Sequence, residues 1–110
     1  MDIKKRSFKF SIKLLEYCFK IYHLKKYEVI IKQVMRSGTI IGANIIEAYA
    51  ASSKKDFRNY YRIALKSANE TNYWLLLLKC FLKNKDVETL LDEVGQISKI
   101  IAKSVINLND

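Results

Sequence analysis

The chain has 110 residues, which suits one folded core rather than two, and half of them are hydrophobic, enough to fill an interior. It has no proline and three glycines, which argues against architectures built from strands and tight turns. The formal net charge of +9 favours polyanionic partners. We therefore expect residues 1–110 to form a single all-α domain.

Charged residues also bear on targeting. Lys13, Glu16 and Lys20 interrupt the apolar stretch that follows the basic N-terminus, so we expect no signal peptide. The longest weakly polar run, residues 37–46, is far shorter than the roughly 20 residues that cross a bilayer. Cys18 and Cys80 stand alone, and we expect both to be buried free thiols. A cytoplasmic protein that does not bind membranes is expected.

The first predicted helix covers residues 7–23. An apolar row at alternating steps of four and three residues predicts its core face: Phe8, Ile12, Leu15, Phe19 and Tyr22. A neighbouring row of Leu14, Cys18 and Ile21 widens the apolar surface. The helix is therefore amphipathic, and its basic turn predicts an antiparallel neighbour.

The second predicted helix covers residues 28–51 and is expected to be the most buried. Its core row is Ile30, Val34, Ser37, Ile41, Asn44 and Ala48. Gly38 and Gly42 each weaken an isolated helix by about 1 kcal/mol relative to alanine, so they predict close approach of a neighbouring backbone. Asn44 and Glu47 are expected to be buried and to need hydrogen-bonding partners.

The third predicted helix covers residues 53–82 and is the most regular. Ser53 is expected to cap it, with Asp56 near the positive end of the helix dipole. A heptad row predicts its core face: Phe57, Tyr61, Ala64, Ala68, Thr71, Leu75, Leu78 and Leu82. The extra apolar width at Trp74, Leu77 and Phe81 predicts contact with another subunit.

The fourth predicted helix covers residues 85–108, with Asn84 as its cap. Its core row is Leu90, Val94, Ile97, Ile101, Ser104 and Leu108, while Gly95 marks either a kink or a close contact. Because short turns join all four helices, sequential neighbours must run antiparallel. The fold class predicted is an antiparallel up-down-up-down four-helix bundle.

Residues 36–48, 53–57 and 64–74 also resemble a known family in the order and spacing of their motifs. The residues that carry the resemblance include Arg36, Ser37, Gly42, Asn44, Glu47, Asp56, Glu70 and Trp74. They are similar to the four-helix bundle proteins encoded in intervening sequences of bacterial 23S ribosomal RNA genes. That family is similar in turn to the accessory variability protein of diversity-generating retroelements, a barrel-like pentamer that associates with reverse transcriptase and nucleic acid. The resemblance implies a ring-like homopentamer and gives these eight residues a structural role.

Charge is distributed unevenly along the chain. Residues 1–36 hold ten basic and three acidic side chains and residues 53–85 hold eight and two, whereas residues 86–110 hold two and five. Clustered positive charge attracts nucleic acid through backbone phosphates, although such rows also occur on ordinary solvated helix faces. The candidate nucleic-acid-binding residues are Lys4, Lys5, Arg6, Lys9, Lys13, Lys54, Arg58, Arg62 and Lys66.

Nothing in the sequence predicts catalysis, a metal site or a cofactor. His23 is the only histidine, too few for a di-metal bundle, and its spacing from Cys18 does not place the two face to face. Glu47 and Glu70 could form an internal acidic pair, but we expect Arg36, Asn44, Asn69 or Lys66 to satisfy them. Two non-enzymatic hypotheses stay open: a basic oligomer that binds RNA or DNA, and an adaptor that docks on a protein such as a reverse transcriptase.

Overall fold

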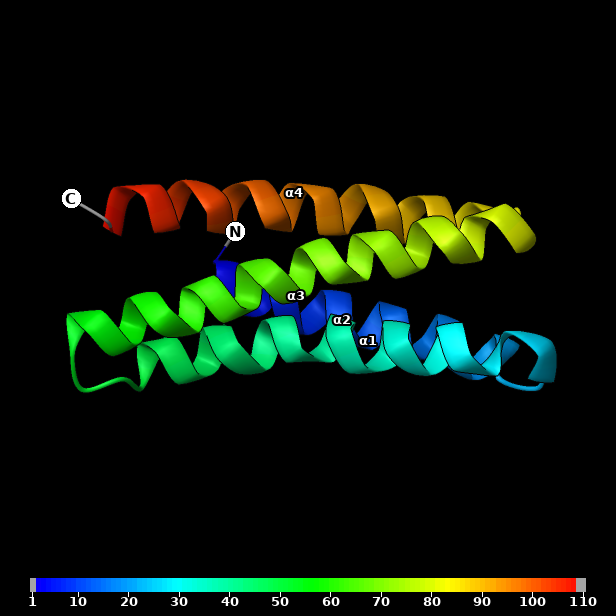
Figure 1. Ribbon diagram of the computed structural model, residues 1–110, viewed down its shortest axis with the longest axis horizontal. Coiled ribbons are helices and arrows are strands. Elements are labelled where there is room, and N and C mark those ends of the chain that lie inside the picture. Colours follow the sequence, from blue (N-terminus) through cyan, green and yellow to red (C-terminus); the bar gives the residue numbers. More distant parts are fainter. Residues whose placement is uncertain (1, 109–110) are drawn as a thin grey trace.

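The computed structural model describes residues 2–108. Four helices make up the fold (Figure 1): α1 (Ile3–Ile21), α2 (Glu28–Tyr49), α3 (Lys54–Phe81) and α4 (Lys85–Leu108), with a 3-10 turn at Lys25–Tyr27 between the first two. No strand occurs in these residues, so the all-α prediction is confirmed. The first helix begins at Ile3 rather than Ser7, because the Asp2 carboxylate accepts a hydrogen bond of 3.0 Å from the Lys4 amide and caps it.

Both predicted caps are confirmed. The Ser53 hydroxyl accepts a hydrogen bond of 3.1 Å from the Asp56 amide at the start of α3. The side-chain oxygen Oδ1 of Asn84 accepts a hydrogen bond of 3.1 Å from the Val87 amide at the start of α4. Asn84 also donates to the Tyr17 hydroxyl at 2.8 Å, which joins the turn before α4 to the side of α1.

The helices form an elongated body of 44 × 22 × 19 Å. The chain reverses direction at each connection in Figure 1, and α1 and α3 each pack mainly against α2 and α4. Both ends of the described chain and the α2–α3 connection therefore lie toward one end of the body, while the other two connections lie at the opposite end. Within residues 2–108, no helix is long and apolar enough to span a membrane.

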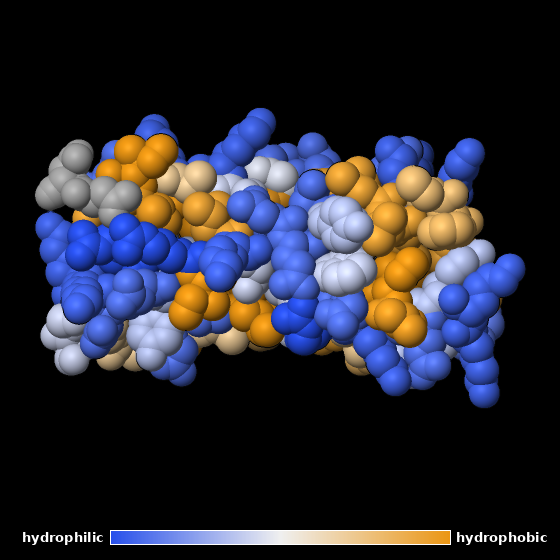
Figure 2. All heavy atoms as spheres, viewed as in Figure 1, coloured by the Kyte–Doolittle hydropathy of each residue, from blue (hydrophilic) through white to orange (hydrophobic). Residues whose placement is uncertain are grey.

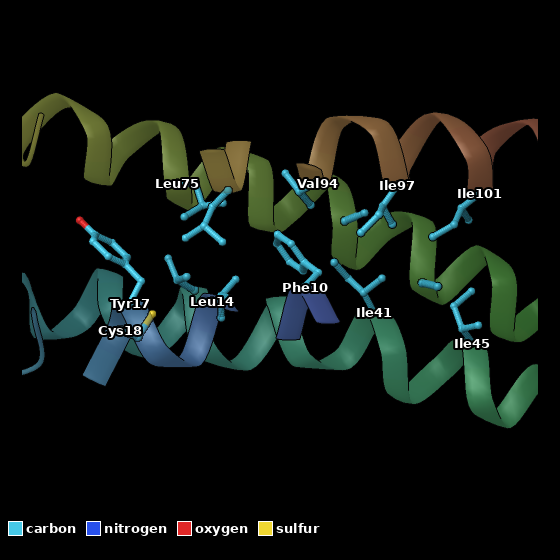
Figure 3. Close-up of a cluster of buried hydrophobic side chains, with 14 of the residues drawn as sticks. Phe10, Leu14, Tyr17, Cys18, Ile41, Ile45, Leu75, Val94, Ile97 and Ile101 are labelled. Carbon is cyan, nitrogen blue, oxygen red and sulfur yellow. The ribbon is translucent and has the colours of Figure 1, made fainter. Parts of the chain in front are cut away.

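All four helices contribute to one core (Figure 3). Phe10, Leu14, Ile41, Leu75 and Ile97 are almost completely buried and point toward the common interior. The predicted α3 row is confirmed from Tyr61 to Leu78, with Phe57 and Leu82 packed at its two ends, and the α4 row is buried from Leu90 to Ile101.

The predicted core face of α1 is wrong. Phe8, Ile12, Phe19 and Tyr22 are exposed and Leu15 is half-buried; the face that packs inward is Ser7, Phe10, Leu14, Tyr17, Cys18 and Ile21. Both rows are apolar, so periodicity alone could not choose between them. The choice is made by shape, because Leu14 fills the space over Gly38 of α2.

The close approach of a neighbouring backbone that was predicted for both α2 glycines is found at Gly42 and not at Gly38. A Cβ on Gly38 would lie 2.5 Å from Cδ1 of Leu14, and one on Gly42 would lie 3.4 Å from Cβ and 3.6 Å from the backbone carbonyl carbon of Ser7. Gly42 therefore lets the α1 backbone approach, while Gly38 receives a core side chain. Gly95 faces open space, so of its two expected roles the close contact is excluded.

Both cysteines are free, as predicted, but Cys80 is exposed rather than buried. Cys18 is completely buried, and burial raises the pKa of its thiol to about 12. Because the thiolate is the reactive form, a disulfide-exchange reagent at pH near 8 should modify one thiol of the folded protein and both in denaturant. The C80S variant is the control and should show no fast reaction when folded. Rapid native labelling of C80S would contradict the placement of Cys18.

Candidate nucleic-acid interface

Positive charge gathers at the end of the body that holds the chain termini. We call residues 2–7, 42–69 and 98–108 the terminal end; Ser7 lies against Gly42, and Ser98 donates a hydrogen bond of 2.9 Å to the Asn69 side chain at its boundary. The terminal end holds ten basic and three acidic residues, whereas residues 8–41 and 70–97 hold ten and seven. Since the body is 44 Å long and charges in physiological salt are screened over about 8 Å, the two ends act almost independently.

Most of the predicted basic row of α3 faces solvent. Lys54, Arg62 and Lys66 are exposed, and Figure 2 shows a band of hydrophilic side chains over the first half of this helix. Arg58 is half-buried instead, and its Nη1 donates a hydrogen bond of 3.0 Å to the carbonyl oxygen of Leu108. A cation at that position also complements the negative end of the α4 dipole. Arg58 therefore holds the end of α4 in place.

The predicted α1 cluster is divided by the structure. Lys5 is exposed in the terminal end, while Lys9 and Lys13, also exposed, lie further along the helix, where they line a cavity of about 230 Å³ with Arg6, Phe10 and Glu93. Arg6 is half-buried and donates two hydrogen bonds of 3.0 Å to the Glu93 carboxylate and another to Gln96. The hydrogen bond to Glu93 raises the pKa of Arg6, and the pairing reduces its attraction for phosphate.

Three exposed lysines of the terminal end were missed by sequence reasoning: Lys55, Lys99 and Lys103. Lys99 and Lys103 belong to a C-terminal segment that is acidic overall, so its summed charge hid them. Within α4, the acidic and basic residues of that segment lie in different halves of the helix. Its acidic residues from Asp86 to Glu93 lie in the first half of α4, and its two lysines lie in the second half, beside the start of α3.

The family-motif residues Arg36, Glu70 and Trp74 form one network between α2 and α3. Arg36 Nη2 pairs with Glu70 Oε2, and Trp74 Nε1 donates to the same oxygen at 2.8 Å. Of the four partners predicted for Glu47 and Glu70, Arg36 pairs with Glu70. At the next residue of each helix, the buried hydroxyls of Ser37 and Thr71 are 2.9 Å apart, a second polar link between the two helices.

Glu47 departs from expectation. It is exposed, with no hydrogen-bonding or ion-pairing partner among residues 2–108, because the inward face of α2 there is Ile45 and Ala48. It lies eleven residues beyond Arg36, about 16 Å along the helix, so it forms no acidic pair with Glu70. Asn44 is half-buried, and its side-chain amide donates a hydrogen bond of 3.0 Å to the carbonyl oxygen of Ile40. Asp56 is exposed in the first turn of α3.

An aromatic cluster lies within the terminal end. Phe57 and Tyr61 of α3 are stacked at 4.8 Å between ring centroids, and Tyr49, the last residue of α2, meets Phe57 edge-on at 5.2 Å. The hydroxyls of Tyr49 and Tyr61 are 3.1 Å apart, and the Lys4 ammonium lies 4.6 Å from the centroid of Tyr49. Burial, together with the Tyr49 hydrogen bond, raises the pKa of Tyr61. Tyr61 is enclosed, whereas Tyr49 remains half exposed.

Other chemistry is not assembled in the described part of the chain. No three His, Cys, Asp or Glu side chains among residues 2–108 are grouped so as to hold a metal ion. His23 is exposed after α1 while Cys18 is buried, so the structure does not bring this pair together. A further cavity of about 320 Å³ between α1 and α4 is lined by both signs of charge, including Lys13, Lys20, Glu16 and Asp86.

The fold and its charged end define a small, basic helical protein. Residues 1–103 match the family described as 23S rRNA-intervening sequence protein, and the chain belongs to that family. The chain is 37% identical in sequence to a protein of unknown function from the S23 ribosomal protein family, from Bacteroides thetaiotaomicron, whose crystal structure is known. It superimposes with a TM-score of 0.88, and the match covers 94% of this chain and 98% of that one. No curated protein matches the chain.

Proposed function

We propose that this protein binds nucleic acid, RNA or DNA, through phosphate contacts made by the terminal end. The observation that carries the proposal is the concentration of ten basic and three acidic residues in that end, most of the lysines being exposed. Lys54 and Lys66 are separated by about 18 Å along α3, a length over which a nucleic acid presents several phosphates. Contacts of this kind recognise the backbone and not the sequence.

The proposed functional unit is an antiparallel up-down-up-down bundle assembled into a ring-like homo-oligomer, a pentamer by family resemblance. The exposed α1 row supports self-association, since Phe8 and Phe19 are 65% and 63% exposed on one side of the helix. The subunit contact predicted on α3 supports self-association less strongly, because Trp74 and Leu77 are half-buried and only Phe81 of the three is exposed. A ring would bring several terminal ends together and strengthen their common field.

The proposal predicts binding that depends steeply on salt. Titration of a labelled duplex with the protein should give an affinity whose logarithm falls linearly with the logarithm of salt concentration, because phosphate contacts release counterions. A neutral polymer of similar length is the control and should not bind. Absence of affinity at about 50 mM salt would contradict the proposal, since phosphate binding is strong there. If capture of a protein partner survives nuclease treatment while duplex binding fails, the adaptor hypothesis takes its place.

A further inference from the structure

Tyr49 places a flat, half-exposed aromatic ring among the charges of the terminal end. Tyr49 is 50% exposed, and the other exposed large apolar residues of that end are isoleucines: Ile46, Ile63, Ile100 and Ile106. The ring does not swing freely, because its hydroxyl bonds the buried Tyr61 and its position is set by edge contact with Phe57. Such a fixed ring is prepared to stack against another flat group at little cost in conformational entropy.

The space beside Tyr49 is shaped for a small planar ligand. An open recess of about 300 Å³ is lined by Tyr49, Phe57, Lys54 and the α2–α3 connection around Ser52 and Ser53. It is too small to accept a duplex but large enough for one nucleotide base. Two rings and the hydroxyls of a turn therefore surround a site that opens to solvent.

Positive charges lie over the Tyr49 ring and in the recess itself. Lys4 of α1 holds its ammonium over the Tyr49 ring, and Lys54 of α3 lines the recess itself. Lys55 is exposed next to it in the chain. A strand that enters the recess would therefore meet ammonium groups close to the ring, the combination of stacking and phosphate contacts that single-strand-binding surfaces use.

We propose that an unpaired base of a single-stranded nucleic acid stacks on Tyr49 in this recess while Lys4 and Lys54 contact the neighbouring phosphates. The inference rests on the proposed function and gives it a preference for single strands over duplexes. In a duplex the base faces are already stacked on one another, so Tyr49 gains nothing from them, whereas the lysines contact phosphates of either form. Stacking tolerates any base, and both RNA and DNA supply the required group.

The test compares oligonucleotides of about 12 nucleotides, single-stranded DNA and RNA against a duplex with the same number of phosphates, at about 50 mM salt. The intact protein should bind the single strands more tightly. Tyr49→Ala should weaken single-strand binding about tenfold and duplex binding less than about twofold, since stacking on one aromatic ring contributes on that scale. Tyr49→Phe loses the hydrogen bond to Tyr61 but keeps the ring, so it should retain most of the single-strand preference.

Two further variants separate stacking from folding. Tyr49→Leu keeps apolar volume in the cluster and should lose single-strand preference as Tyr49→Ala does, while circular dichroism confirms that it is helical. Tyr73→Ala removes a ring that is 56% exposed in the second half of α3 and should leave binding unchanged. Photocrosslinking of a strand that carries iodouracil should attach it to Tyr49 or Phe57.

The outcomes distinguish the two proposals. Equal affinity of the intact protein for single strands and duplexes, or equal weakening of both by Tyr49→Leu, would overturn the stacking site while nucleic-acid binding stands. Failure of the intact protein to bind either form would overturn the proposed function and this inference with it. Crosslinks confined to residues outside the terminal end would also overturn the stacking site.

Discussion

Replacing Gly38 by valine should lower the free energy of unfolding by about 2–3 kcal/mol, because the new side chain has no room in the core. A Cβ at Gly38 would already lie 2.5 Å from Cδ1 of Leu14. Leu14 is completely buried, so it can move only by displacing other core side chains. The better helix propensity of valine offsets only about 0.5 kcal/mol. Chemical denaturation followed by circular dichroism measures the difference.

Gly95→Val is the matched control. Nothing lies within 4 Å of a Cβ at Gly95, although it too is inside a helix. This variant should change stability by less than about 0.5 kcal/mol, in either direction. Both variants need the same protein concentration, since self-association would contribute to apparent stability. Equal losses at the two glycines would contradict the packing of Leu14 over Gly38.

A double variant tests the same contact from the other side. Leu14→Ala alone should cost about 2–5 kcal/mol through the cavity it leaves. Combined with Gly38→Val, the cost should be clearly less than the sum of the two single changes, since valine enters space that leucine vacates. Strict additivity would show that the two positions do not share that space.

Local features of this fold were predictable from the sequence. The caps at Ser53 and Asn84 are hydrogen bonds to amides only three residues further along the chain. The first half of α3 has a single apolar face, which its heptad row identifies. The α1 face was not predictable in the same way, because two apolar rows compete and Gly38 on another helix decides between them. Glu47 was misjudged because its neighbours in sequence are apolar, although it points away from the core.

The candidate site, too, has residues that local sequence predicts and residues that only the packing of the helices reveals. Lys54, Arg62 and Lys66 follow a helical period and could be found in sequence, whereas Arg58 in the same row binds the end of α4. Lys99 and Lys103 join the proposed site only because the end of α4 packs beside the start of α3. Tyr49 gains its role in the same manner, from a lysine on α1 and rings on α3. Sequence charge led to the proposed ligand class, and the fold led to the proposed surface.

Reversing charge at the terminal end should abolish most nucleic-acid binding. In the terminal variant, four exposed lysines become glutamate: Lys5, Lys54, Lys55 and Lys103. Removing about four phosphate contacts and adding repulsion should weaken duplex binding about 100-fold or more at low salt and flatten the dependence on salt. None of the four belongs to the hydrophobic core, so the helical content should be unchanged.

The matched control reverses four exposed lysines at the opposite end: Lys25, Lys26, Lys83 and Lys85. Contact between the rings of Tyr27 and Phe81, 5.7 Å apart, shows that the two connections carrying these lysines are neighbours there. This variant has the same net charge as the terminal variant but keeps the terminal end intact. It should therefore bind with an affinity within about threefold of the natural protein, because charges so far apart are screened from each other.

Duplex binding by these two variants, measured side by side over a range of salt concentrations, tests the central claim most directly. We expect the terminal variant to lose affinity and salt dependence while the control retains both. Equal weakening of the two would show that overall charge, and not the terminal end, attracts nucleic acid, and would contradict the account.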